Sequence, residues 1–100
     1  MGGDGAPAAT VSVETVQQRF HALDNPLRLR LARSLVRAPR TTADLAAAWG
    51  VSASEVSRHV GVLRDAGLVT SVRRGRQVLH ELDLAATARV GQDLVAALLR

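Results

Sequence analysis

The sequence contains no cysteine, and this absence excludes several kinds of chemistry at once. Disulfide bonds, thiolate metal sites and cysteine nucleophiles all need the thiol group. A chain without cysteine also suits a reducing compartment, and we expect a cytoplasmic protein.

Long apolar runs and leader features are missing as well. No apolar stretch approaches the ~20 residues that a membrane-spanning helix needs, so no membrane partner is expected. The opening residues, MGGDGAPAAT, lack the basic and apolar regions of a signal peptide. Gly, Ala and Pro dominate there without a period, which predicts a disordered tail over 1–11 and one folded domain over 12–100.

The sequence also lacks the motifs of enzymes and metal sites. No Ser-His-Asp arrangement, phosphate-binding glycine loop or pair of acids is visible, so we do not expect an enzyme. His21, His59 and His80 fall on different predicted elements, whereas a metal needs ligands that converge. We therefore expect no cofactor and no metal, and we expect His59 to be partly buried with a hydrogen bond.

Residues 41–67 are the most informative part of the sequence. Thr41 and Asp44 are spaced as in a capping box, which predicts the start of a helix that Gly50 ends. A second capping pattern, S-A-S-E, opens another helix over 52–66. Two short helices joined by a glycine-containing turn are typical of a helix-turn-helix.

The second helix of this pair has one apolar and one polar face. Val56, Val60 and Leu63 recur at i, i+4 and i+7, which indicates a buried stripe. Small and polar side chains fall on the opposite face, where they could enter a DNA major groove and contact bases and phosphates. An ordinary solvated helix face is the alternative interpretation. The predicted contacts from the two helices are Thr42, Ser52, Ser54, Ser57, Arg58 and Gly61.

After these helices the hydrophobic period changes from helical to extended. Residues 68–73 and 77–82 are predicted to form an antiparallel hairpin, with glycine at its turn, where positive φ costs little. A hairpin that follows a helix-turn-helix is a wing, and its tip would contact the DNA backbone or a minor groove. The predicted contacts at the tip are Arg73, Arg74, Gly75 and Arg76.

The net charge of +4 is concentrated in the same region. Five arginines and a single acid lie between Arg58 and Arg76, and the remaining arginines and acids of the chain balance each other. A basic patch beside a helix-turn-helix is typical of nucleic-acid binding. The alternative is a winged helix used for protein–protein contact without specific DNA binding, which need not carry this charge.

The flanking segments are predicted to be helical. Helices are expected over 13–23 and 26–37, capped by Ser12 and Asn25, and one continuous helix is expected over 84–99. In the helix over 26–37 we expect the leucines to face inward, and Arg28, Arg30, Arg33 and Arg37 to face mostly outward. Trp49 is expected to be a core or inter-helix residue.

The first and last helices carry apolar stripes larger than a ~100-residue core needs, so we predict that they pair in a homodimer. Gly91 would suit the close approach of a partner helix, although a tolerated glycine is an equal alternative. The predicted interface residues are Val13, Val16, Phe20, Ala88, Gly91, Leu94, Val95 and Leu98.

The order of these elements resembles the ArsR/SmtB group of bacterial winged-helix repressors. The matching segments are ALDNPLRLRLARSL at 22–35, VSASEVSRHVGVLRDAGLV at 51–69 and RRGRQVLHEL at 73–82. The expected fold is therefore mostly α with a small β-hairpin wing, a winged helix-turn-helix of about five helices and a two-stranded antiparallel wing. The resemblance implies a nucleoid-associated homodimer that binds double-stranded DNA at an inverted-repeat operator and whose repression is relieved by an effector.

The chain departs from this group at the positions that sense effectors. Many metal sensors of the group carry cysteines in the first helix of the helix-turn-helix, but residues 43–49 hold no thiolate. Others pair Asp with His on the last helix, but residues 84–100 offer Asp93 and no His. An organic effector, a partner protein and no effector at all stay open.

Overall fold

The computed structural model describes residues 11–100, so the predicted tail lies almost entirely outside the described residues. Helix α1 (Val13–Leu23) begins after Ser12, whose hydroxyl accepts a hydrogen bond from the backbone N–H of Thr15. Helix α2 (Pro26–Arg37) begins after Asn25, whose side chain accepts from a backbone N–H in the first turn. Both helices start at the predicted caps because these bonds satisfy backbone donors that the helix leaves free.

The helix-turn-helix consists of α3 (Thr42–Trp49) and α4 (Ala53–Asp65). Thr41 and Asp44 form the predicted capping box, since each side chain accepts a hydrogen bond from the other's backbone N–H. Gly50 ends α3 with φ +65°, a conformation that glycine adopts without steric cost. The Ser52 hydroxyl then accepts from a first-turn N–H of α4.

Three short strands form a small antiparallel sheet, in which their spatial order is β1-β3-β2. Strands β2 (Val69–Arg74) and β3 (Gln77–Leu82) form the wing, and β2 starts one residue later than predicted. The predicted two-stranded antiparallel wing is confirmed, and β1 (Arg40–Thr41), which was not predicted, adds a third strand to the sheet by pairing with β3. A strand of two residues carries no hydrophobic period, so no local pattern indicates it.

The prediction of a single helix over 84–99 was wrong, because the chain forms α5 (Leu84–Ala88) and α6 (Val90–Leu99) with a break at Arg89. The Thr87 hydroxyl donates a hydrogen bond to the carbonyl of Asp83, at 2.8 Å. This bond to the residue four positions earlier bends helices, because the hydroxyl competes for a carbonyl of the helix ladder. The described residues therefore contain six helices instead of about five.

Arg28 is buried, and the expectation that it faces outward was wrong. Its guanidinium donates hydrogen bonds to the carbonyls of Ala22 and His21, at 2.7 and 3.3 Å, and lies 3.1 Å from Nδ1 of His59. Position 28 lies three residues before the buried Leu31, and this spacing places it on the inward face of α2. Arg28 thus joins the end of α1 to α4.

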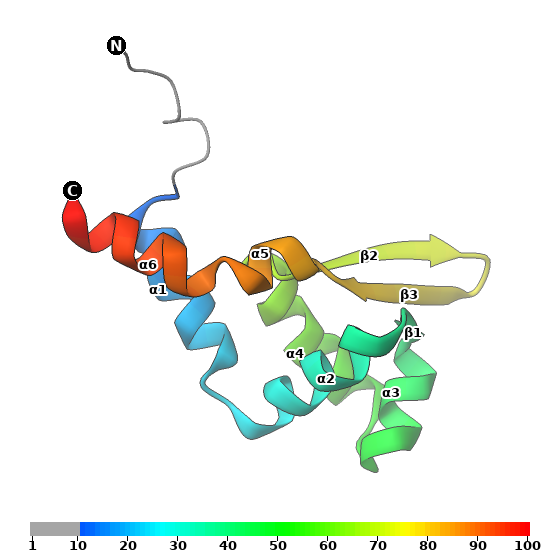
Figure 1. Cartoon of the computed structure of the whole chain (residues 1–100). Coiled ribbons are helices and arrows are strands. Elements are labelled where there is room, and N and C mark those ends of the chain that lie inside the picture. The colour runs from blue at the N-terminus through cyan, green and yellow to red at the C-terminus, as the bar shows by residue number, and fades with distance from the viewer. Residues whose placement is uncertain (1–10) are drawn as a thin grey trace.

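The core lies between α2, α3, α4 and the start of β2, where the largest fully buried side chains are Leu31, Leu45, Leu63, Leu68, Val56 and Val60. Trp49 is an inter-helix residue as expected, since its indole N–H donates to Ser34 of α2 and its ring lies under the Arg30 guanidinium. In Figure 1, α1 and α6 lie side by side at one end of the molecule, and the wing extends from the other end. No helix within residues 11–100 is long and apolar enough to cross a membrane.

Candidate DNA-binding surface

Helix α4 presents the two faces that its sequence predicts. Val56, Val60 and Leu63 are fully buried. The opposite side exposes Ser54, Ser57 and Arg58, while Gly61 is half-buried and Ser52 is exposed at the cap. No side chain from another element covers Gly61, because a Cβ there would meet only Arg64 of the same helix, at 3.6 Å. The outer face of α4 is therefore open along its first two turns.

A groove of about 230 Å³ brings the start of α3, the start of α4 and the wing together. Thr42 and Arg76 both line this groove, so two predicted contacts that are far apart in the sequence share one surface. The lining residues are Thr41, Thr42, Ala43, Ala53, Arg76, Gln77 and Val78.

The tip of the wing carries three exposed arginines, Arg73, Arg74 and Arg76. The chain reverses at Gly75, which has φ +63°, and the Arg73 guanidinium donates to the Gly75 carbonyl at 3.3 Å. Within the described part of the chain, the only ion pair joins Arg19 to Asp93, so no acid neutralises the wing arginines. Their charge is available to an anionic partner.

The three histidines lie on α1, α4 and β3, and two of them, His59 and His80, are buried and hydrogen-bonded. His59 has the expected hydrogen bond, in this case with Arg28. Burial, followed by the nearby charges of Arg58 and Arg28, lowers the pKa of His59, and Glu55 partly opposes this effect. Burial and then the charge of Arg64 lower the pKa of His80. Nothing in residues 11–100 gathers three or more His, Cys, Asp or Glu side chains into a possible metal site.

The paired helices α1 and α6 expose much of the apolar surface assigned to a dimer interface. Among the predicted residues, Phe20 is 42% exposed and Leu98 is 73% exposed. Val16 differs, because it is buried within the protomer and supports the packing of α1. Leu84 and Leu99, which are not among the predicted interface residues, are also exposed and lie on the C-terminal helices α5 and α6. The other predicted residues are exposed or half-buried, namely Val13, Ala88, Gly91, Leu94 and Val95.

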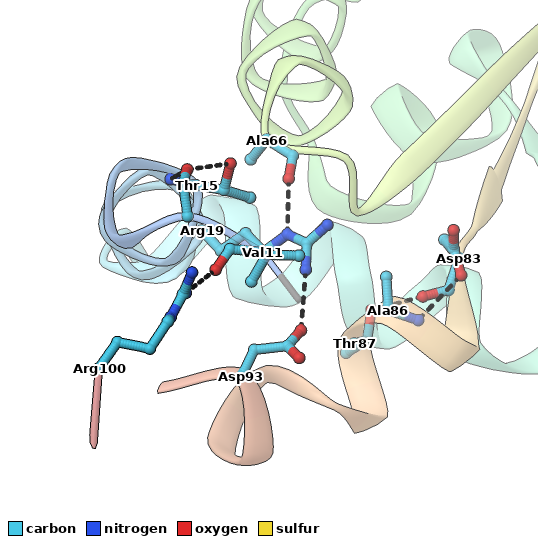
Figure 2. Close-up of polar contacts among 10 residues, drawn as sticks. Val11, Thr15, Arg19, Ala66, Asp83, Ala86, Thr87, Asp93 and Arg100 are labelled. Atoms are coloured by element: carbon cyan, nitrogen blue, oxygen red, sulfur yellow. Dashed lines mark hydrogen bonds and ion pairs between the residues drawn. The ribbon is translucent and has the colours of Figure 1, made fainter. Parts of the chain in front are cut away.

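Arg19 connects these helices to the end of α4 (Figure 2). Its Nε donates to the carbonyl of Ala66, the C-cap of α4, at 3.0 Å. Its Nη1 lies 3.3 Å from Oδ2 of Asp93 on α6, and both side chains are nearly buried. Sequence reasoning missed this contact, because its partners lie 47 and 74 residues away and no local pattern relates them.

Known proteins with similar sequences are transcriptional regulators. Residues 23–72, half of the chain, match the family model described as a helix-turn-helix domain. The chain is 36% identical over 77 residues to the transcriptional regulator NmtR of Mycobacterium tuberculosis, with 77% of this chain and 64% of NmtR covered. It is 43% identical over 75 residues to the transcriptional repressor SmtB homolog of Synechocystis, with 72% and 57% covered. The chain thus spans less than two thirds of the length of both relatives.

The structure is similar to that of a homodimeric winged helix-turn-helix DNA-binding domain from Mycobacterium bovis, described as a possible ArsR-family transcriptional regulator. The two share a TM-score of 0.73 and 26% identity, over 97% of this chain and 90% of the other. The predicted fold, a winged helix-turn-helix that is mostly helical with a small β wing, is therefore confirmed.

Proposed function

The chain belongs to the ArsR/SmtB family of helix-turn-helix regulators, and we propose that it is a homodimeric, sequence-specific DNA-binding repressor. Helix α4 enters the major groove, with Ser54, Ser57 and Arg58 facing the bases. The wing arginines contact the phosphate backbone beside that groove. The protein acts in the cytoplasm on chromosomal DNA, and its role is binding, with no catalysis.

One observation carries this proposal. The start of α3, the start of α4 and the wing residue Arg76 line a single groove, and the outer face of α4 is exposed. A wing arginine without an acidic partner among the described residues therefore lines the same groove as small polar side chains of the helix-turn-helix, an arrangement that suits DNA phosphates and base edges. A winged helix for protein contact need not carry this concentration of positive charge.

The proposed dimer is supported by the exposed apolar side chains of α1 and α6, which a monomer would leave in water. Pairing of these helices across a two-fold axis would place the two α4 helices about one DNA turn, ~34 Å, apart. Such a protein binds an inverted repeat, because the symmetry of the site mirrors the symmetry of the dimer.

Selection of bound duplexes from a random DNA pool tests the proposal directly. We expect an inverted repeat whose half-site centres lie about one helical turn apart. The affinity of the selected duplex should exceed that of unrelated DNA by at least about 10³-fold at physiological salt. Equal affinity for all duplexes would refute sequence-specific binding, and no retention on DNA or heparin would favour the protein-contact alternative.

A further inference from the structure

The wing has almost no core of its own. Beyond Ser71 every β2 side chain is exposed, including Val72 at 52%, and the exposed run continues through Gln77 on β3. Two-stranded hairpins are only marginally stable in isolation. The direction in which this hairpin points is therefore decided at its base, where it joins the rest of the fold.

His80 occupies that base. It is 3% exposed and lies on β3, where it pairs with Ser71 of β2 on one side and with Arg40 of β1 on the other. Its Nδ1 is 2.7 Å from the Ser71 hydroxyl, and its Nε2 is 2.8 Å from the hydroxyl of Thr42, the first residue of α3. The ring thus bridges the wing and the helix-turn-helix.

The chain of hydrogen bonds continues to α4, because Nη1 of Arg64 donates to the same Ser71 hydroxyl at 3.2 Å. Burial and the Arg64 charge lower the pKa of His80, which keeps the imidazole neutral with one donor and one acceptor. A hydroxyl that accepts from a cation is a stronger donor, so Ser71 donates to Nδ1 and Nε2–H donates to Thr42. Hydrogen bonds then join side chains from α4, β2, β3 and α3, and both nitrogens of the His80 ring have a partner.

We propose that His80 is a positioning residue that fixes the wing against the helix-turn-helix, so that the wing arginines and α4 meet DNA as one rigid surface. This inference rests on the proposed function of the site. From Ser71 to the turn at Gly75 the strand spans about 13 Å, so a rotation of about 10° at the base displaces the tip by about 2 Å. A displacement of that size removes a charge-assisted hydrogen bond between an arginine and a phosphate.

Replacing Ser71 with Ala is the cleanest perturbation, because it interrupts the network and leaves the imidazole, the arginines and the α4 face in place. Thr70→Ala is the matched control, since Thr70 precedes Ser71 on β2, is exposed and points to the other face of the sheet. Amide hydrogen exchange in the free protein reports the position of the wing without DNA. We expect faster exchange over residues 72–78 in Ser71→Ala and no change in Thr70→Ala.

The second measurement uses the selected operator duplex and a double-mutant cycle with Arg76→Ala. Ser71→Ala alone should weaken binding about fivefold, the effect of removing one hydrogen bond. If His80 positions the wing through Ser71, Arg76→Ala will cost clearly less affinity in the Ser71→Ala background than in the wild type. His80→Gln, whose amide offers one donor and one acceptor, should bind DNA more tightly than His80→Phe.

Additive costs in the cycle together with unchanged exchange over residues 72–78 would overturn the proposal. A wild-type protein that binds no duplex would refute the proposed function, while hydrogen exchange in the free protein would still decide whether the network holds the wing. Should His80→Phe fail to fold, the Ser71→Ala and Thr70→Ala pair gives the answer alone.

Discussion

At the scale of single residues, Arg58 is the side chain on which sequence discrimination should depend most. It is exposed on α4, next to Ser57 and on the side away from the buried stripe. Replacing Arg58 with Ala should cost about 1–3 kcal/mol of binding to the selected operator if the guanidinium pairs with a guanine edge. Fluorescence anisotropy with operator and scrambled duplexes would measure this. An equal loss on both duplexes would show that Arg58 contacts only phosphates.

Arg37→Ala is the matched control for this measurement. Arg37 is exposed at the end of α2 and belongs to neither the predicted DNA contacts nor the predicted dimer interface. The variant removes the same charge from the protein, so it reports the effect of net charge alone. We expect it to retain the operator preference of the wild type.

His59 gives the stability of the protein a defined pH dependence. Its pKa in the folded protein is lowered by burial and by Arg58 and Arg28, so below about pH 6.5 the unfolded chain binds more protons than the folded one. Stability is therefore full above that pH and falls as the pH decreases toward 5, with His80 acting in the same direction. Urea unfolding at pH 7.5 and 5.5 should show this loss.

The variant His59→Gln tests the cause of that loss. The Gln side chain carbonyl can still accept from Arg28 but does not titrate, so the pH dependence should become smaller while the fold is kept. An identical pH dependence in the variant and the wild type would assign the effect to other groups.

At the scale of elements, the wing should contribute affinity without sequence preference. Arg74 and Arg76 are exposed at its tip and have no acidic partner among the described residues. The variant Arg74→Ala/Arg76→Ala should weaken binding to operator and unrelated DNA by similar factors. The slope of log affinity against log salt should fall by about one unit for each phosphate that a subunit no longer neutralises. A selective loss on the operator would instead place the wing in a groove that reads sequence.

The junction of α1, α4 and α6 depends on Arg19. Replacing it with Met would keep most of the side-chain packing but leave the Ala66 carbonyl and the nearly buried Asp93 carboxylate without a donor. We expect a loss of about 1–3 kcal/mol in unfolding free energy. Gln18→Met, at an exposed neighbouring position on α1, should cost far less. Similar urea midpoints for the two variants would contradict the assignment.

At the scale of the whole molecule, the features that could be predicted are those that depend on residues close together in the sequence. The helix starts at Ser12, Asn25, Thr41 and Ser52 could be predicted, because each cap bonds to a backbone N–H three residues away. The buried stripe of α4 could be predicted for the same reason, since helical periodicity is local.

The features that could not be predicted depend on distant partners. Arg28 is buried because carbonyls at the end of α1 and His59, 31 residues on, satisfy its donors. Strand β1 exists because β3 pairs with it, and the network at Ser71 and His80 depends on that sheet. In the candidate site, the outward residues of α4 and the wing tip could be predicted from the sequence pattern. The contacts that orient α4 and the wing could not, because their partners are distant in the sequence.

The predicted dimer concerns the whole molecule, and Leu98 is the position that tests it. Leu98 is 73% exposed on α6, so a charged residue there does not disturb the core of the protomer. Leu98→Glu should nevertheless give monomers, because burying an unpaired carboxylate in an apolar interface costs far more than leaving it in water. Operator binding should be abolished as well, since one α4 helix reaches only half of an inverted repeat.

Leu29→Glu provides the comparison. Leu29 is 52% exposed on α2 and is not among the predicted interface residues, so this variant should remain dimeric and bind the operator. Sedimentation velocity at micromolar concentration distinguishes the two forms, and circular dichroism verifies that both variants are folded. A wild-type protein that sediments as a monomer, or a Leu98→Glu dimer, would show that α1 and α6 do not form the interface, and the exposed residues of these helices would then need another partner.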